Sequence, residues 1–501
     1  MSTMDWETVI GLEVHCELAI ETKMFCGCPN DFGALPNTNV CPVCLGLPGS
    51  LPVLNERAVE FALRVGEALH CAVPEASIFH RKNYFYPDMP KNYQVSQYDE
   101  PICGNGWLEV PGPDGTARRI GIERAHLEED AGKTSHVGGG GGGRVHGADH
   151  SLVDYNRAGV PLLEIVSKPD LRNAEEARAY VAELRGVLEA IGVSDVKMEE
   201  GSLRVDANIS LRPVGTEKLG TRTEIKNMNS LRSLGRALEY EAERQAEVLE
   251  SGEAVMQETR HWDEEAGRTH SLRSKEESHD YRYFPEPDLV PIAPAAEWRD
   301  QVRAGMPELP AARKARLMDA WGISETDAGV LVGTPGLADY AEAAAAAATG
   351  ASVATGRGVA NWVTGELMAH LNETGAAPSD LSLPPAGLAE LVKLVGEGTL
   401  SRPLAKEVLA AALAGEGNGS PAAIVAARGL AQVSDEGALA AAVQAVLDAH
   451  PAEVDRYRSG EDKDRKKLRG FFMGKVMAEM KGRGNPQVLN RLLDEALPTN
   501  A

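Results

Sequence analysis

The sequence predicts an α+β region followed by a long helical region, and two observations support this division. Up to about Pro291, short stretches that alternate between apolar and polar residues are separated by Gly and Pro, with helical patterns between them. Beyond that point Ala, Leu, Glu and Arg recur with helical periodicity, and clear strand patterns stop. At roughly 100–200 residues per domain, the 501 residues predict two to four domains.

Composition and charge exclude several classes of protein. Hydrophobic residues make up 43% and charged residues 25% of the chain, which is typical of a globular protein and not of a disordered or collagen-like one. The net charge of −23 disfavours histone-like binding to polyanions, so any contact with nucleic acid must come from a local patch. The first residues lack the features of a signal peptide, and no apolar run reaches about 18 residues. We therefore expect a cytoplasmic protein without a membrane span.

Helical periodicity predicts three helices within the α+β region. They cover Glu56–His70, Ala174–Ile191 and Ser230–Leu249. The consecutive glycines of Gly138–Gly143 cannot hold a packed element, so they predict the flexible tip of a hairpin. In the helical region the alanine run Ala343–Ala348 predicts a helix. The glycines of Gly350–Gly358 predict a break there, and Gly415–Ser420 predicts a turn between helices.

Four cysteines near the start of the chain form the clearest metal-binding pattern. They are Cys26, Cys28, Cys41 and Cys44, arranged as C-x-C and C-x₂-C. Four thiolates from two short segments suit tetrahedral Zn²⁺, and four protein ligands leave no open position for a substrate, so we predict a structural zinc site. The alternatives are reduced free thiols on a loop and an iron–sulfur cluster. The remaining cysteines, Cys16, Cys71 and Cys103, are expected only to pack.

Several strand-like stretches carry acidic, basic and imidazole side chains on one face. In a strand from Ile10 to Leu18, alternation places Glu13, His15 and Glu17 on the same side. Three further stretches repeat this spacing, with Arg204, Asp206 and Asn208, with Glu224 and Lys226, and with Arg124, His126 and Glu128. Each alone is most simply the solvated face of a sheet. Together, they supply the carboxylates that hold Mg²⁺ and the cations that clamp phosphate oxygens.

Two aromatic clusters, Arg81–Lys91 and Asp280–Asp288, combine Tyr with Arg and Lys. Tyrosine rings can stack on a base while the neighbouring cations contact phosphate or carboxylate, although simple loop packing is the alternative. Their prolines predict rigid loops and not strands, and loops often carry substrate contacts.

The charge reverses near the C-terminus. Between Arg456 and Arg491 there are eleven basic and four acidic side chains, a local net charge of +7. Such segregation is expected of a surface that contacts a phosphate backbone, whereas a solvated helical face is the alternative. The candidate nucleic-acid-binding residues are Arg465, Lys466, Lys467, Arg469 and Lys475.

Long motifs in fixed order resemble the B-subunit family of the bacterial tRNA-dependent amidotransferases (GatB/GatE, in the GatCAB complex). They are Val9–His15, Arg81–Asp88, Leu127–Lys133, Ser194–Arg204, Asp206–Arg212 and Asp280–Asp288, with Asn485–Gln487 near the end. Two features depart from the family pattern. The glycine stretch Gly138–Gly143 is longer than the expected turn, and Cys16 lies directly after the first motif.

The resemblance implies both a fold and a reaction. It implies a catalytic cradle like that of glutamine synthetase over residues 1–292, a helical domain over 293–405 and a YqeY-like tail over 406–501, with YqeY-type homology over about 350–501. It also implies a ligase that forms a carbon–nitrogen bond with glutamine as the amido donor. Side-chain phosphorylation of Glu-tRNA(Gln) or Asp-tRNA(Asn) by ATP is followed by amidation with ammonia. Mg²⁺ with Arg and Lys is the usual means of stabilising such phosphoryl transfer.

The family's site residues can be carried over one by one. Its Mg²⁺ site corresponds to Glu13, His15, Glu128 or Glu129, Asp206 and Glu224, and the substrate and phosphate contacts to Lys82, Tyr84, Tyr86, Arg204 and Lys226. The cofactors implied are Mg²⁺, ATP as substrate, and structural Zn²⁺. No amidase or glutaminase signature is evident, so we expect ammonia to come from the amidase of the family's complex, its A chain. The implied assembly is a heterotrimer that also includes the small C chain and acts on misacylated tRNA.

Two other functions remain possible at this point. The chain could be a non-catalytic tRNA-binding scaffold whose acidic strands are only a solvated sheet face. It could also be a stand-alone, ATP-dependent amide ligase acting on a small acid.

Overall fold

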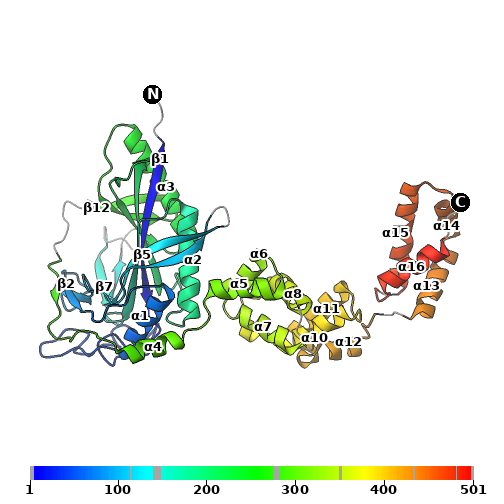
Figure 1. The fold of residues 1–501 in the computed structure, drawn as a ribbon, viewed down its shortest axis with the longest axis horizontal. Coiled ribbons are helices and arrows are strands. Elements are labelled where there is room, and N and C mark those ends of the chain that lie inside the picture. The colour runs from blue at the N-terminus through cyan, green and yellow to red at the C-terminus, as the bar shows by residue number, and fades with distance from the viewer. Residues whose placement is uncertain are drawn as a thin grey trace. The chain divides into compact units, whose positions relative to one another are not determined.

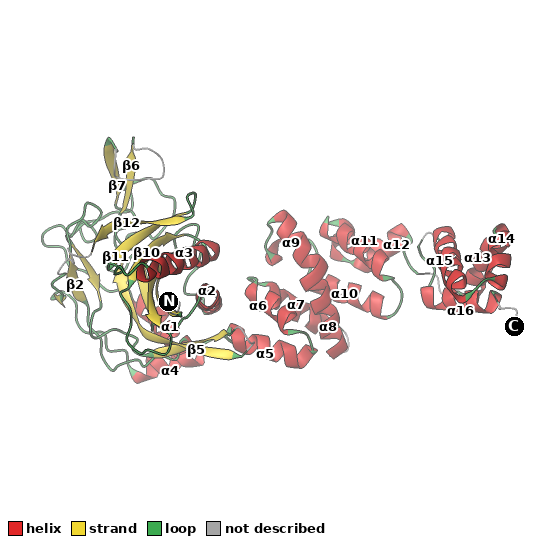
Figure 2. Cartoon of the chain, turned by 90° about the horizontal axis from the view of Figure 1, so that it is seen from above, coloured by secondary structure: helices red, strands yellow, loops and turns green. Residues whose placement is uncertain are grey.

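The computed structural model describes residues 5–112, 116–138, 148–274, 281–348, 353–432, 435–480 and 482–497. It divides into two compact units, Met1–Pro310 and Ala311–Ala501. The first contains the strands, whereas the described part of the second is helical (Figure 2). The predicted change from a mixed α and β region to a helical one is therefore confirmed, and the finer division into three domains stays a prediction.

The first unit is built on an eight-stranded sheet of order β12-β11-β10-β9-β1-β8-β5-β4 (Figure 1). Its strands are β1 (Trp6–Glu17), β4 (Gly106–Pro111), β5 (Ala117–Glu129), β8 (Pro161–Ser167), β9 (Leu203–Pro213), β10 (Thr223–Met228), β11 (Glu258–Asp263) and β12 (Arg268–Ser274). Neighbours are antiparallel except for β10 and β11. Strand β1 lies in the middle, between β8 and β9, so its side chains occupy the centre of both faces.

Helices begin where the sequence predicts them, because polar caps precede them. The three long helices are α1 (Glu56–Ala68), α2 (Ala174–Ala190) and α3 (Leu231–Glu250), and the short α4 (Ala296–Ala304) follows. The side chains of Asn55, Asn173 and Ser230 each accept a hydrogen bond from a backbone N–H in the first turn. Such caps satisfy donors that the helix itself leaves unpaired.

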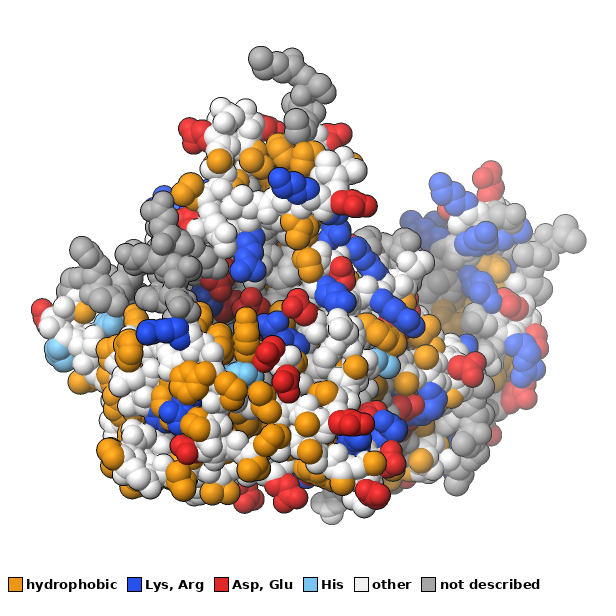
Figure 3. Space-filling model, turned by 60° about the vertical axis from the view of Figure 1, so that its left-hand side comes forward, with side chains coloured by type: hydrophobic (Ala, Val, Ile, Leu, Met, Phe, Trp, Pro, Cys, Tyr) orange, Lys and Arg blue, Asp and Glu red, His pale blue; other side chains and the backbone are white. Residues whose placement is uncertain are grey.

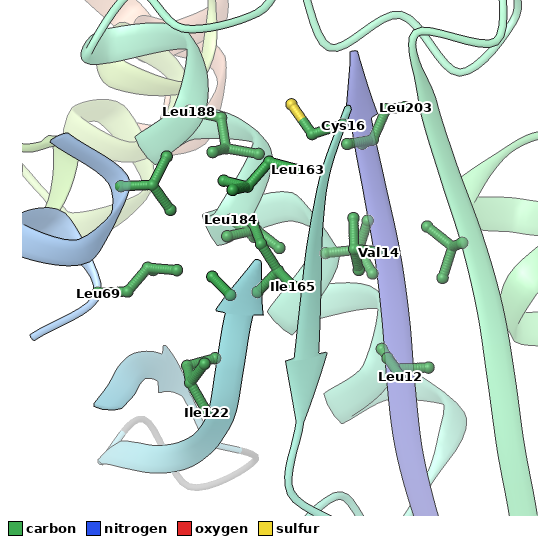
Figure 4. Close-up of a cluster of buried hydrophobic side chains, with 14 of the residues drawn as sticks. Leu12, Val14, Cys16, Leu69, Ile122, Leu163, Ile165, Leu184, Leu188 and Leu203 are labelled. Carbon is green, nitrogen blue, oxygen red and sulfur yellow. The ribbon is translucent and has the colours of Figure 1, made fainter. Parts of the chain in front are cut away.

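The helices and one face of the sheet enclose the hydrophobic core. Leu12, Val14 and Cys16 of β1 are fully or almost fully buried with leucines of α2. Figure 4 shows this cluster, in which Leu163 and Ile165 of β8 lie beside Leu184 and Leu188 of α2. Since alternate residues of a strand point to opposite faces, the side chains between these core residues belong to the other, polar face.

The aromatic clusters differ from their prediction, because each includes a strand. Strands β2 (His80–Asn83), β3 (Tyr93–Ser96) and β13 (Phe284–Pro285) form a small sheet of order β13-β2-β3. The expectation of loops without strands is therefore wrong for these segments. Pro285 is compatible with a strand because β13 is at an edge, where a missing N–H costs no ladder hydrogen bond. Pro87 and Pro90 follow β2 in turns.

A separate pair of strands flanks the predicted glycine tip. Strands β6 (Lys133–Val137) and β7 (His150–Asp154) pair antiparallel, with Val137 opposite His150. This agrees with a hairpin, and Gly138 has a positive φ of 83° that favours glycine. Residues 139–143 of the predicted tip lie outside the described residues.

The second unit is a series of short helices. They are α5 (Pro310–Trp321), α6 (Glu325–Gly333), α7 (Leu337–Ala347), α8 (Val353–Trp362), α9 (Met368–Thr374), α10 (Pro385–Gly396), α11 (Arg402–Leu413), α12 (Pro421–Arg428), α13 (Glu436–Ala449), α14 (Pro451–Ser459), α15 (Asp462–Glu479) and α16 (Pro486–Ala496). Two hydrophobic clusters stabilise them, one between Leu317 and Val425 and one between Leu439 and Leu497. No helix in the described ranges is long and apolar enough to cross a membrane.

Two of the three predictions for this region are confirmed. The alanine run lies in α7, and a turn at Glu416–Gly419 separates α11 from α12. The predicted break is wrong at Gly356 and Gly358, which lie inside α8, while residues 349–352 are not described. These glycines allow close packing, since a Cβ on Gly356 would come within 2.3 Å of the Trp321 ring.

Candidate functional site

The register of the sheet brings the predicted polar residues together. On β1, Glu13 is opposite Asp206 of β9, and His15 is opposite both Arg204 of β9 and Glu164 of β8. Antiparallel partners directly across a ladder have Cβ atoms about 4.5–5.5 Å apart. The alternation that buries the other face therefore gathers acidic and basic side chains from separate segments on this one.

Three carboxylates form what we call the first acidic group, Glu13, Asp206 and Glu224. One ligand atom from each lies within 4.8 Å of the others. The Lys226 ammonium pairs with Asp206 and lies 3.1 Å from Glu224, while Asn208 donates a 2.9 Å hydrogen bond to Glu13. Burial, followed by repulsion from Glu164 and Glu224, raises the pKa of Glu13. A divalent cation would relieve this repulsion, and carboxylate oxygens are its usual ligands.

The second acidic group consists of His15, Glu128 and Glu164, whose ligand atoms also lie within 4.8 Å of one another. His15 Nε2 is 3.7 Å from Glu128 and 3.6 Å from Glu164, and Nε2 of the buried His126 is 3.2 Å from Glu164. Burial opposes the charge of His126, but the two carboxylates raise its pKa to about 9. In return, despite its own burial, Glu164 has a pKa lowered by His126, His15 and Lys82.

Neighbouring acids at the end of β5 point to different partners. Glu128 joins the second acidic group, whereas Glu129 forms a buried ion pair with Lys91 and accepts a 3.0 Å hydrogen bond from the Val95 N–H. Strand alternation separates them. The next residue, Asp130, is buried and accepts hydrogen bonds from Arg204, with the shorter at 2.5 Å. Of the two predicted alternatives, the structure brings only Glu128 to the acidic groups.

The other predicted contacts divide into those near the acidic groups and those away from them. The Lys82 ammonium nitrogen, Nζ, lies 5.1 Å from the centroid of the Tyr281 ring. Burial opposes its charge, but Glu128 leads the groups that raise its pKa. Tyr84 lies beside Tyr281, with ring centroids 6.3 Å apart. Tyr86 is 55% exposed in the turn after β2, and Glu129 belongs to neither acidic group.

The four clip cysteines, Cys26, Cys28, Cys41 and Cys44, converge. Their sulfur atoms all lie within 4.8 Å of one another, a geometry that one metal ion can bridge. The Cys41 N–H donates to Cys44 Sγ at 3.1 Å, as expected of a C-x₂-C clip. Hydrogen bonding from Cys26, against some burial, lowers the pKa of the Cys44 thiol to about 4. The pKa values of the Cys26 and Cys28 thiols are raised instead. A bound cation would favour the thiolate form, which is the form that binds metal, so four converging sulfur atoms fit a tetrahedral ion.

Three functional-looking residues were not predicted: Glu164, Asp130 and Lys91. Glu164 had a usable signal, since it is the single charged residue in the apolar strand Pro161–Ser167. A lone acid in such a run must either find a partner or bind a cation. Asp130 and Lys91 gave no comparable signal, because their ion pairs join segments far apart in the sequence.

Two cavities open on the polar face of the sheet. The larger, of about 900 Å³, is lined by Glu17, Arg204, Asp206 and Lys226, among others. The smaller, of about 610 Å³, is lined by Gly11, Glu13 and Asn208, among others. One face of the molecule has a hollow where acidic side chains gather beside Lys and Arg (Figure 3).

The predicted nucleic-acid surface lies on α15. Lys466 and Lys467 are exposed, whereas Arg465 is half-buried and donates to the Tyr457 carbonyl at 3.3 Å. Two others have intramolecular partners. Arg469 forms a bidentate pair with Asp494 at 2.8 and 2.9 Å, and Lys475 lies 5.5 Å from the Phe471 ring centroid.

The fold and site together define a class of protein: an α+β unit whose sheet carries carboxylates and cations suited to divalent metal and phosphate, followed by a helical unit. Comparison with known families narrows this class. Residues 8–300 match the GatB/GatE catalytic domain, and residues 344–497 match the GatB domain. The chain belongs to the GatB family, as the sequence motifs predicted.

Full-length relatives share one name, the B subunit of aspartyl/glutamyl-tRNA(Asn/Gln) amidotransferase. The protein of Frankia casuarinae is 53% identical over 98% of this chain and 96% of its own length. That of Moorella thermoacetica is 52% identical over 99% of this chain and 100% of its own. That of Salinispora arenicola is 54% identical over 98% and 96%, respectively.

Glu17 provides a test of the electrostatics at the edge of the site. Burial and the nearby Asp130 raise its pKa from 4.5 to about 7, so the folded state binds a proton that the unfolded state has lost. Ionising Glu17 therefore costs more in the folded state than in the unfolded state. The free energy of unfolding of the wild type is unaffected by Glu17 below pH 4.5 and falls as the pH rises from there to about 7. In EDTA, Glu17→Gln should become progressively more stable than the wild type over this range, measured by urea unfolding.

The matched control is Glu21→Gln, since Glu21 is exposed, and it is measured under the same conditions. The difference in unfolding free energy between Glu21→Gln and the wild type gives the baseline effect of a Glu-to-Gln change at the surface. A flat profile for Glu17→Gln would contradict the raised pKa.

Proposed function

We propose that this chain is the B subunit of a tRNA-dependent amidotransferase, and that it activates the side-chain carboxylate of glutamate on tRNA(Gln), of aspartate on tRNA(Asn), or of both. The observation that carries the proposal is the convergence of Glu13, Asp206 and Glu224 beside Lys226. The name that the relatives share supports it, because it describes an amidotransferase of Asp/Glu-tRNA.

The reaction has two steps. A side-chain carboxylate oxygen of the substrate attacks the γ-phosphorus of ATP, the bond to the bridging oxygen breaks, and ADP leaves. Ammonia then attacks the carbonyl carbon of the acyl phosphate, the carbon–oxygen bond breaks, and phosphate leaves with the surplus proton. The carboxylate needs this activation because its own oxygen is a poor leaving group.

The chain's own residues have distinct tasks in this scheme. The first and second acidic groups would hold Mg²⁺, which supplies positive charge next to the transferred phosphoryl group. Lys226 and Arg204 stabilise phosphate oxygens from the adjacent strands. Lys82, near Glu128, adds a third positive charge to those of Lys226 and Arg204. Tyr84 and Tyr281 provide an aromatic surface for the substrate.

The proposal has consequences for partners and for the fold. The chain acts in a heterotrimer as a carbon–nitrogen ligase, together with a small C chain and with an amidase, the A chain, that supplies glutamine-derived ammonia. The first unit corresponds to a cradle like that of glutamine synthetase. Cys26, Cys28, Cys41 and Cys44 hold a structural Zn²⁺, because four cysteine ligands leave no position for a substrate.

Substitution of Asp206 tests the catalytic proposal against the scaffold alternative. In the reconstituted heterotrimer, Asp206→Asn should lower the rate of ATP-dependent amidation by about 10²-fold or more, because a lost cation ligand removes several kcal/mol of transition-state stabilisation. Binding of charged tRNA, measured by filter binding, should stay within about twofold. The exposed Asp319→Asn is the matched control and should leave both quantities unchanged.

Equal loss of amidation and of tRNA binding in Asp206→Asn, or loss of neither, would favour the scaffold. The stand-alone ligase alternative predicts that the purified chain amidates a free amino acid with ammonia and ATP. Inactivity in the absence of charged tRNA removes that alternative.

Metal analysis tests the zinc proposal. Emission spectrometry of the full-length chain should find about one zinc per chain, and Cys41→Ser should lose most of it because a four-ligand site is left with three. Cys71→Ser is the control, since Cys71 lies outside the cluster. Iron in the wild type, or equal zinc in both variants, would contradict the proposal.

Substitutions on α15 test the nucleic-acid surface. The double variant Lys466→Ala/Lys467→Ala should weaken tRNA binding and reduce the slope of log affinity against log salt by about one for each lysine–phosphate interaction removed. Lys393→Ala on α10, which is also exposed, should change neither value. An unchanged slope in the double variant would exclude these lysines as phosphate contacts.

A further inference from the structure

The Glu224 carboxylate of the first acidic group has a neutral hydrogen-bond donor on a neighbouring strand. The Thr259 hydroxyl donates to Glu224 Oε2 at 2.6 Å, and Lys226 Nζ lies 3.1 Å from the other oxygen, Oε1. A separation of 2.6 Å is within the range of a charge-assisted hydrogen bond between a hydroxyl and a carboxylate. Each oxygen of Glu224 therefore has its own donor.

The strand register sets this contact. Strands β10 and β11 are parallel, and Glu224 is directly opposite Thr259. The register of β11 with β12 shifts between Thr259 and Arg260, and such irregularities re-aim side chains next to active sites. Thr259 is 7% exposed, so water has little access to its hydroxyl, and its β-branched side chain has few rotamers.

A buried polar network holds β11 from the other face of the sheet. Arg260, which follows Thr259 and therefore points the opposite way, lies 3.5 Å from the fully buried Glu241 of α3. Arg260 also donates to Thr269 Oγ1 at 2.7 Å, and Thr269 donates to Glu241 at 3.1 Å. Hydrogen-bonded networks of this kind rigidify the segments that they join. The backbone that carries Thr259 is thus fixed independently of Glu224.

A hydroxyl has an advantage over a charged donor beside a metal ligand. Carboxylates that bind a metal ion are oriented by hydrogen bonds from surrounding residues. A cationic donor such as Lys226 orients a carboxylate but also repels the metal ion. The Thr259 hydroxyl orients Glu224 without adding a charge. It also restricts a flexible glutamate side chain before the metal ion binds, which lowers the entropic cost of binding.

We propose that Thr259 is a positioning residue, whose hydroxyl holds the Glu224 carboxylate in the orientation that binds the divalent cation of the first acidic group. This role rests on the proposed function, which places Mg²⁺ at that group. Thr259 acts through Glu224 and contacts neither the cation nor a substrate.

Metal binding to the full-length chain tests this role. The probe is Mn²⁺, which takes the same oxygen ligands as Mg²⁺, and free Mn²⁺ is measured by electron paramagnetic resonance. Thr259→Val removes the hydroxyl and nearly keeps the volume, so it should raise the Kd for Mn²⁺ by about tenfold or more. Thr259→Ser keeps the hydroxyl and should stay within about threefold of the wild type. Asp206→Asn removes a ligand, so the binding that it loses identifies the site.

The matched control is Thr269→Val, which makes the same substitution in the adjacent strand. Thr269 is also buried, but its hydroxyl contacts Arg260 and Glu241 on the other face. This variant should lower the midpoint of urea unfolding and leave the Kd for Mn²⁺ within about threefold of the wild type. A loss of Mn²⁺ binding equal to that in Thr259→Val would show that packing of β11, and not orientation of Glu224, sets the affinity, and would overturn the proposal.

A titration with Mg²⁺ in the reconstituted heterotrimer, in excess over ATP, provides a second measurement. In Thr259→Val the Mg²⁺ concentration for half-maximal amidation should rise by about tenfold, while kcat at saturating Mg²⁺ stays within about threefold of the wild type. If Thr259→Val does not unfold cooperatively in urea, Thr259→Ala replaces it in both measurements, because a smaller side chain cannot overpack the site.

The outcomes separate this role from the proposed function. An unchanged Kd for Mn²⁺ in the folded variant without the hydroxyl, or no Mn²⁺ binding to the wild type, overturns the role of Thr259 even if the wild-type heterotrimer amidates charged tRNA. Binding in Thr259→Ser that is as weak as in Thr259→Val also overturns it. A wild-type heterotrimer that does not amidate charged tRNA overturns the proposed function instead.

Discussion

The antiparallel register of β1 with β8 and β9 is the constraint on which the site depends. It sets Glu13 opposite Asp206 and His15 opposite both Arg204 and Glu164. The same alternation sends Leu12, Val14 and Cys16 into the core. A shift by one residue would expose these apolar side chains and bury the acids, so packing on one face holds the chemistry on the other in place. The core thus contributes to function without touching a substrate.

Concentrating so many charges on a half-buried face has an electrostatic cost that the structure offsets by pairing. Lys226 lies between Asp206 and Glu224, His126 contacts Glu164, and Arg204 binds Asp130. Breaking one such pair leaves a partly buried charge without compensation, which is more damaging than a neutral substitution of both partners. Lys226 and Arg204, which neutralise these acids, are also the side chains proposed to bind phosphate. The same side chains therefore contribute to stability and to substrate binding.

Periodicity and motif order predicted much of this arrangement. Alternation in β1 and β9 identified Glu13, His15, Arg204 and Asp206 as members of one face, because a period of two survives in almost any sheet. Cysteine spacing likewise predicted the convergence of Cys26, Cys28, Cys41 and Cys44. Tertiary pairing could not be predicted in the same way. Glu164 joins His15 only because β8 lies beside β1, and Lys91 meets Glu129 through a fold contact that no local pattern records. Prolines were a poor guide at β13, since an edge strand tolerates them.

The end of β5 is a place where the chain cannot gain or lose a residue without a change in its ion pairs. Glu128, Glu129 and Asp130 are consecutive acids that serve three separate partners, the second acidic group, Lys91 and Arg204. The β5–β8 register is regular from Arg124 to Glu129, so deletion of one residue within that stretch would place the wrong acid opposite each partner. The β6–β7 arm pairs only with itself in the described sheets, and it can lengthen or shorten at its tip without altering that assignment. Variation in length between homologues should therefore collect in this arm and be absent from the end of β5, between Arg124 and Glu129.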